Sequence, residues 1–275
     1  MIQTMIVGKQ SNLSSFLGEK LEGVRLISAR DASKEIENIQ VHEHQPVNIV
    51  FNNFQPSRQL NNLEKPSQYV DAAIGNTGEI LELLLIHGFN INKILYTSSS
   101  SVYGDNIFCK ETDALKPKSL HAALKVANEK LIEKFCVDNG ISYAIIRLFN
   151  MYGGHDKFSV VSKIINAFKN KKDLSIVNQG NAIRDFIYIN DVANVYQYLL
   201  DAEVIPNIIN IGTGTGNSVR GIIDFIENKG FHLNVVNCKK DEIKVSTANI
   251  EVLSDMYSFK MMDVKEYILM KLDEE

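Results

Sequence analysis

The sequence predicts an α/β protein built on a doubly wound parallel sheet, chiefly because of the way its apolar residues are spaced. Short apolar stretches of strand length alternate with longer stretches whose apolar residues recur at helical spacing. The first of these strands ends at Gly8, which allows the chain to turn sharply before an amphipathic stretch begins. Strands that are joined through helices run parallel, and the helices cover the faces of the sheet.

Most of the predicted elements lie before Phe149. In chain order they are strands at 4–7, 24–28, 48–51, 94–98 and 142–148, and helices at 14–21, 67–87 and 121–139. Gly140 follows the last of these helices and is predicted to end it in the left-handed conformation. Beyond Phe149 the alternation is less regular, and no repeat or low-complexity linker marks the change.

The composition is that of an ordinary globular protein and argues against several functions. The 275 residues are 45% hydrophobic, and the net charge of -4 provides no basic surface for nucleic acid or for a membrane. The 3 cysteines have neither metal-ligand nor disulfide spacing, and the histidines show no metal-site pattern with carboxylates. No apolar run reaches the roughly 20 residues that a bilayer requires, and no basic region precedes the first strand. We therefore expect a cytoplasmic protein with no metal, no nucleic acid partner and no membrane partner.

One segment, residues 96–125, carries most of the information about function. It reads Y-T-S-S-S-S-V-Y-G-D and, after an interval, S-L-H-A-A-L-K. Later segments read L-F-N-M-Y-G (148–153), R-D-F-I-Y-I-N-D-V (184–192) and N-I-G-T-G (210–214). Together these motifs resemble the extended short-chain dehydrogenase/reductase family of nucleotide-sugar epimerases, dehydratases and 4-ketoreductases. The resemblance implies a dinucleotide-binding Rossmann domain at 1–149 and a smaller nucleotide-sugar-binding part at 150–275. It also implies that the helix after Asp191 packs back on the Rossmann sheet.

The predicted cofactor site departs from the pattern of this family. The family has G-x-x-G-x-x-G after its first strand, whereas this chain has Gly8, Ser11 and Ser14. The motif predicts strain at Ser11 if that residue must adopt the φ values that glycine adopts freely. The second strand ends in Ser28-Ala29-Arg30 without an acidic residue, and a basic residue there favours NADP over NAD. Phe54 is expected to crowd a bound dinucleotide.

Two interpretations of this cofactor site remain open. One is a modified NADP site, with NAD as the alternative cofactor, formed by Gly8, Lys9, Ser11, Leu13, Arg30 and Lys125. The other is a Rossmann scaffold that has lost its cofactor.

The predicted catalytic residues follow from the same resemblance. Ser99 matches the catalytic Ser/Thr of the family and Lys125 the catalytic Lys, while His121 stands where the family has its catalytic Tyr. Histidine can transfer protons near neutral pH, and Lys125 lies one helical turn after His121 on the same face. Burial and the Lys125 charge are expected to lower the pKa of His121. The alternative is that His121 has lost the catalytic role and only packs against the protein or caps the helix.

Three residues are predicted to bind the nucleotide sugar, namely Ser100, Asn150 and Arg184. In the family, the positions of Asn150 and Arg184 contact the nucleotide diphosphate, and a guanidinium binds phosphate with two parallel hydrogen bonds. The alternative for Arg184 is a structural ion pair with Asp185 or Asp191. Ser100 and Ser101 occupy positions where 4,6-dehydratases carry acids, which argues against dehydration.

We therefore expect a nucleotide-sugar 4-ketoreductase or epimerase that uses NADP and acts on a nucleotide-sugar substrate. The main alternative is a catalytically silent binding or scaffold protein, and a 4,6-dehydratase is a less favoured one. A homodimer is expected, formed through the helices at 67–87 and 121–139, since long helices with wide apolar stripes suit such an interface.

Overall fold

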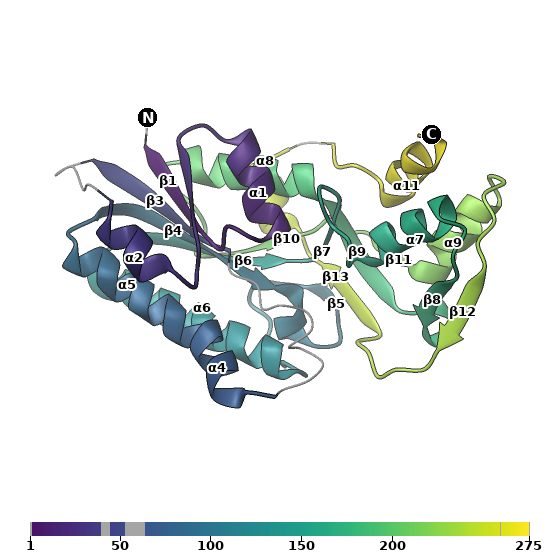
Figure 1. The fold of residues 1–275 in the computed structure, drawn as a ribbon, viewed down its shortest axis with the longest axis horizontal. Coiled ribbons are helices and arrows are strands. Elements are labelled where there is room, and N and C mark those ends of the chain that lie inside the picture. The colour runs from purple at the N-terminus through teal and green to yellow at the C-terminus, as the bar shows by residue number, and fades with distance from the viewer. Residues whose placement is uncertain (1, 40–44, 53–63, 259, 275) are drawn as a thin grey trace. The chain divides into compact units, whose positions relative to one another are not determined.

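A computed structural model describes residues 2–39, 45–52, 64–258 and 260–274 (Figure 1). The chain divides by its internal contacts into two units. The first comprises Met1–Val102, Pro117–Arg147 and Tyr196–Ile209, and the second comprises Tyr103–Lys116, Leu148–Val195 and Asn210–Glu275. The expected boundary after residue 149 lies close to the Arg147/Leu148 junction, but two further segments are exchanged between the units.

The first unit is built on a six-stranded sheet with the order β10-β6-β4-β3-β1-β2. Strand β1 pairs in parallel with both β2 and β3, and β3 pairs in parallel with β4. The strands are β1 (Gln3–Val7), β2 (Val24–Ile27), β3 (Pro46–Phe51), β4 (Asn90–Ser99), β6 (Ser142–Leu148) and β10 (Ile208–Ile211). The strand order reverses between β1 and β3, and the carboxyl ends of strands at such a point form the usual ligand site of this kind of sheet.

The helices of the first unit include the three predicted ones and an additional one, Ala32–Glu37, that was not predicted from the sequence. They are α1 (Asn12–Lys20), α2 (Ala32–Glu37), α4 (Pro66–Val70), α5 (Asn76–Ile86) and α6 (Leu120–Asn139). The helix expected at 67–87 contains a π-helical turn, Asp71–Gly75, between α4 and α5. Apolar residues of α2, α5 and α6 pack against the sheet in one core that includes Ile36, Leu84 and Ile132, and Figure 1 shows these helices along the same face.

Gly140 ends α6 as predicted. Its φ of 64° and ψ of 29° are left-handed, and its N–H bonds to the last turn of the helix.

The second unit combines small sheets with a group of helices. One sheet has the order β11-β9-β13-β5, with β7 paired to β9, and a separate pair joins β12 to β8. Its strands are β5 (Asn106–Cys109), β7 (Asn150–Tyr152), β8 (Leu174–Val177), β9 (Ile183–Tyr188), β11 (Gly216–Ser218), β12 (Val235–Cys238) and β13 (Val245–Ala248). Its helices are α7 (Val160–Lys169), α9 (Val219–Glu227), α10 (Glu251–Met256) and α11 (Val264–Asp273). Residues of α7, α9 and α11, among them Ile164, Ile223 and Ile268, share one hydrophobic core.

One helix, α8 (Ile189–Asp201), belongs to both units. It begins in the second unit, and its residues from Tyr196 onward belong to the first. Tyr196 is fully buried there, and its hydroxyl lies 2.5 Å from the hydroxyl of Thr97 in β4. Across the described residues, no helix has both the length and the apolar character needed to cross a bilayer.

Candidate active site

The turn after β1 retains the geometry that a glycine motif usually provides. Gly8 has a φ of 105°, and its N–H and that of Lys9 both donate to Ile27 O, at 2.8 and 3.0 Å. Ser11 is the N-cap of α1 with φ −76° and ψ 147°, a conformation open to any residue. The backbone strain that was predicted for Ser11 is therefore absent, because in this turn the positive φ falls at Gly8 and not at Ser11.

A hydrogen-bonded network holds the two serines that replace glycines. Asn52, the residue after β3, donates through Nδ2 to Ser11 Oγ at 3.0 Å and to Ser14 Oγ at 2.9 Å. Ser11 Oγ also accepts the Ser14 N–H at 3.0 Å, and Ser14 and Asn52 are fully buried. The serine side chains thus tie the turn to β3 across the point where the strand order reverses. Phe54, which was expected to crowd this site, lies outside the described residues.

Residues 52–55 were predicted to lie at a strand end beside the cofactor, but the bonds from Asn52 to the two serines were not predicted. The available signal was a buried polar residue directly after an apolar strand, at the end of the sheet where ligands bind. Leu13 was identified, but its side chain is fully buried in the core, so that only its backbone could face a ligand.

The basic residues predicted for the cofactor site are Lys9 and Arg30. Lys9 Nζ forms an ion pair with Glu35 at 2.9 Å, and both side chains are partly exposed. Arg30 makes no hydrogen bond or ion pair with a described residue. Its guanidinium is therefore free of competing contacts within the described part of the chain.

The start of α6 carries His121 and Lys125 on successive turns. Ser119 caps the helix by accepting the Ala122 N–H at 3.2 Å. Lys125 is 5% exposed, and its Nζ donates to Thr97 O in β4 at 2.7 Å. This contact brings the start of α6 against the end of β4, where Ser99 lies.

Burial changes the protonation of both groups. Desolvation, and secondarily the charge of Lys125, lowers the pKa of His121 to about 4. Desolvation lowers the pKa of Lys125 to about 8, although the Glu129 carboxylate opposes that change. The expected direction for His121 is confirmed. At neutral pH its imidazole is uncharged, while Lys125 is mostly an ammonium.

Ser99 is oriented by its neighbour Ser101. Ser99 Oγ accepts the Ser101 N–H at 3.2 Å and the Ser101 hydroxyl at 3.0 Å. Because both bonds use the oxygen as acceptor, the Ser99 hydroxyl proton is available to donate to a ligand oxygen. Ser100 is buried, with 8% of its surface exposed.

A buried ion pair, together with a hydrogen bond from Ser98, connects the elements that carry Lys125 and Ser99. Arg147 Nη2 lies 2.9 Å from Glu129 Oε2, and the two side chains are 4% and 2% exposed. Ser98 Oγ donates to the other oxygen of the same carboxylate. Glu129, one turn after Lys125, therefore links α6, β4 and β6; it escaped the sequence analysis because its role is visible only through contacts from distant strands.

In the second unit, Asn150 and Arg184 have partners within the protein. Asn150 Nδ2 donates to Asp185 O at 3.3 Å. Arg184 pairs with Glu242 at 3.2 Å, and the second oxygen of Glu242 accepts Asn178 Nδ2 at 3.1 Å. An ion pair of Arg184 was the alternative prediction, but its partner is Glu242 and not Asp185 or Asp191. The Asp185 carboxylate accepts the N–H groups of Thr213, Gly214 and Ala248. Burial lowers the pKa of Arg184, and Glu242 opposes this.

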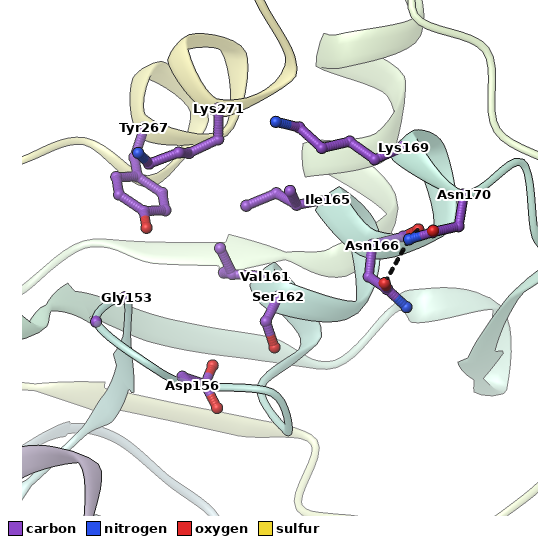
Figure 2. Close-up of a pocket in the computed structure, with 11 residues that line it drawn as sticks. Gly153, Asp156, Val161, Ser162, Ile165, Asn166, Lys169, Asn170, Tyr267 and Lys271 are labelled. Carbon is purple, nitrogen blue, oxygen red and sulfur yellow. Dashed lines mark hydrogen bonds between the residues drawn. The ribbon is translucent and has the colours of Figure 1, made fainter. Parts of the chain in front are cut away.

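A cavity of 310 Å³ lies between α7 and α11 in the second unit (Figure 2). The residues that line it include the apolar Val161 and Ile165 and the basic Lys169 and Lys271. Both lysine amines contact Glu274, one at the backbone oxygen and the other at the carboxylate. None of the predicted site residues lines this cavity.

The sheet order and the turn at Gly8 are typical of dinucleotide-binding α/β enzymes. Residues 10–212 match the model of the NAD dependent epimerase/dehydratase family. The chain belongs to this family, and it is an enzyme of the nucleotide-sugar epimerase/dehydratase type.

Individual relatives are similar over much of their length. The chain is 25% identical to Protein CapI of Staphylococcus aureus over 93% of this chain and 86% of that protein. It is 31% identical to a UDP-glucuronate 4-epimerase of Thermodesulfobacterium geofontis over 68% of this chain and 59% of that protein. Its fold matches that of UDP-glucuronic acid 4-epimerase from Bacillus cereus, solved with UDP-glucuronic acid and NAD, with a TM-score of 0.83, 21% identity and 98% of each chain covered.

The turn after β1 fits a dinucleotide. The first turn of α1 contains no acidic residue that would oppose a phosphate, and Lys9 provides a positive charge beside it. Gly8 has the positive φ that the tight turn requires. The hydroxyl oxygens of Ser11 and Ser14 accept hydrogen bonds from Asn52, so they are held within the protein. The residues that would hold the dinucleotide are therefore Gly8, Lys9, Ser11 and the backbone of Leu13, with Lys125 near its reactive end.

Proposed function

We propose that this protein is a nucleotide-sugar 4-epimerase in which His121 replaces the tyrosine of the family as the proton-transferring group. The observation that carries the proposal is the arrangement of Ser99, His121 and Lys125 at the meeting of β4 and α6, anchored by the bond from Lys125 Nζ to Thr97 O at 2.7 Å. Two relatives support the proposal, one named as a UDP-glucuronate 4-epimerase and one as a putative UDP-glucose 4-epimerase.

Each residue has a distinct task in this proposal. Neutral His121 accepts the proton of the C4 hydroxyl, while the Ser99 hydroxyl donates to the same oxygen and orients it. The Lys125 ammonium favours loss of a proton from the groups around it. A bound nicotinamide would supply the redox chemistry, as the acceptor and then the donor of the C4 hydrogen with its two electrons, that is, of a hydride.

The low pKa of His121 favours epimerisation over net ketone reduction. In an epimerase, the proton that His121 takes from the C4 hydroxyl can be returned to the C4 oxygen in the second half of the reaction. A 4-ketoreductase must instead draw that proton from solvent through a group that is rarely protonated at neutral pH, because its pKa is about 4. The 4-ketoreductase is thus the second candidate, and a silent scaffold the third.

In the second unit, Asn150 and Arg184 are proposed to bind the nucleotide diphosphate. Arg184 would exchange its bond to Glu242 for phosphate oxygens, which suit the guanidinium geometry. Arg30 predicts a preference for NADP, because no described residue competes for its guanidinium, whereas the Bacillus cereus relative was solved with NAD.

The proposal is tested by proton NMR of UDP-glucose and UDP-glucuronic acid incubated with the protein and either dinucleotide. We expect the C4 epimer to accumulate with wild-type protein and not with His121→Ala. His87→Ala is the matched control, since His87 lies at the end of α5, outside the proposed site. Formation of a reduced or dehydrated sugar, or equal activity of both variants, would contradict the proposal.

A further inference from the structure

Two acidic side chains, those of Asp31 and Glu35, contact the residue that follows β2, although Ser28-Ala29-Arg30 itself contains no acid. Rossmann sheets that bind NAD usually carry Asp or Glu at this point, where it accepts hydrogen bonds from the ribose of the adenosine. This chain has Ser28-Ala29-Arg30 instead. Glu35, which comes from α2, lies beside this position, since its Oε1 accepts the Ser28 N–H at 3.4 Å.

Further contacts fix Glu35 beside the turn that follows β1. The same Oε1 is 2.9 Å from Lys9 Nζ. Lys9 in turn donates its N–H to Ile27 O, the last residue of β2, at 3.0 Å. The start of the short helix α2 is also tied to the end of β2, since Ser28 Oγ donates to Asp31 Oδ2 at 3.0 Å and Glu35 N donates to Asp31 O at 3.0 Å.

The carboxylate is held but remains accessible. The side chain of Glu35 is 28% exposed and that of Lys9 is 43% exposed. A partly exposed ion pair of this kind contributes little to stability, so a ligand can compete for the carboxylate at small cost. One oxygen of Glu35 makes the described contacts, and a carboxylate can accept several hydrogen bonds at once.

We propose that Glu35 recognises the ribose diol of the adenosine and makes the site selective for NAD over NADP. This inference rests on the proposed function, because it concerns the dinucleotide of the same site. A carboxylate accepts hydrogen bonds from two neighbouring hydroxyls, whereas a 2′-phosphate would bring a second anion against it. Glu35 thus predicts a preference for NAD, whereas Arg30 predicts a preference for NADP. One measurement distinguishes the two predictions.

That measurement is calorimetric titration of wild-type protein, Glu35→Gln and Glu37→Gln with NAD and with NADP. Glu37 is the matched control, since it is exposed on the same helix and undergoes the same change. We expect wild type and Glu37→Gln to bind NAD more tightly than NADP. In Glu35→Gln the ratio of the two dissociation constants should change by about tenfold in favour of NADP, because a like charge has been removed.

Two results would overturn the inference while leaving the proposed function intact. They are tighter binding of NADP by wild type, and a ratio in Glu35→Gln that equals that of Glu37→Gln. Failure of wild type to bind either dinucleotide, while UDP-glucuronic acid still binds, would instead overturn the proposed function and the role of Glu35 together. Thermal unfolding of the two variants shows whether α2 keeps its fold.

Discussion

His121 is the residue at which this chain departs most from its family, and its protonation should set the pH range of activity. If neutral His121 is the base, 4-epimerisation should decline as the pH falls through its pKa of about 4. If the Lys125 charge is also needed, the rate should decline again as the pH rises through about 8. We therefore expect a plateau between these limits in a pH profile of kcat.

Substitutions at His121 test this assignment. Alanine should reduce turnover by roughly 10²–10⁴-fold, the usual contribution of a general acid–base group. Tyrosine should shift the acidic limb of the profile upward, since its ordinary pKa is about 10. An alanine variant with full turnover and an unchanged profile would show that His121 does not transfer the proton.

Arg184 offers a second prediction at the scale of single residues. Glu242→Gln removes the carboxylate that pairs with the guanidinium at 3.2 Å, which leaves Arg184 more available to a diphosphate. The affinity for UDP-glucuronic acid should rise by about 1.4- to fivefold, because a partly exposed ion pair is worth about 0.2–1 kcal/mol. Asp241→Asn is the control, since it removes the same charge from the same loop. Equal affinities in the two variants would argue against diphosphate binding by Arg184.

Among the elements, α5 and α6 each contain a glycine whose replacement by alanine can be tested, Gly78 inside α5 and Gly140 in the left-handed turn that ends α6. Gly140 has a φ of 64°, and a methyl group added there would meet no atom within 4 Å, so Gly140→Ala should cost about 1 kcal/mol through the backbone alone. Gly78 lies within α5 with equal space around it, and Gly78→Ala should stabilise by about 0.5–1 kcal/mol. Denaturant unfolding measures both. A stabilised Gly140→Ala would contradict the proposed helix stop.

The elements also show how far the sequence could be interpreted. Strands such as β6 and helices such as α6 were predictable, because their apolar spacing and the Gly140 stop are local signals. The π-helical turn Asp71–Gly75 was not, since nothing in the spacing distinguishes it from an α-helix.

The candidate site likewise contains residues that the sequence predicts and residues that it does not. Ser99, His121 and Lys125 were found because they stand in a motif. Asn52, Glu129 and Glu35 were missed because each acts through a partner distant in the sequence, namely Ser14, Arg147 and Lys9. Ser11 was suspected of strain only because the family carries glycine there.

At the scale of the whole molecule, a homodimer remains predicted through the segments of α5 and α6. Apolar side chains are exposed on both helices, with Ile86 76% exposed and Val137 64% exposed. Light scattering at micromolar concentration should give the mass of a dimer for wild type and of a monomer for Ile86→Lys. Val204→Lys is the control, since Val204 is 85% exposed outside these helices. A monomeric wild type would rule out this arrangement.

The most direct test of the proposed function is a single-turnover measurement of the dinucleotide itself. Protein saturated with oxidised dinucleotide is mixed with UDP-glucuronic acid, and the near-ultraviolet absorbance of the reduced nicotinamide is followed. We predict a transient rise that decays as the sugar is epimerised at C4, and its absence in His121→Ala although the dinucleotide still binds. Bound dinucleotide in the wild type with no absorbance change toward UDP-glucuronic acid or UDP-glucose, at any pH between 4 and 8, would contradict the proposed 4-epimerase and the roles of Ser99, His121 and Lys125 in it.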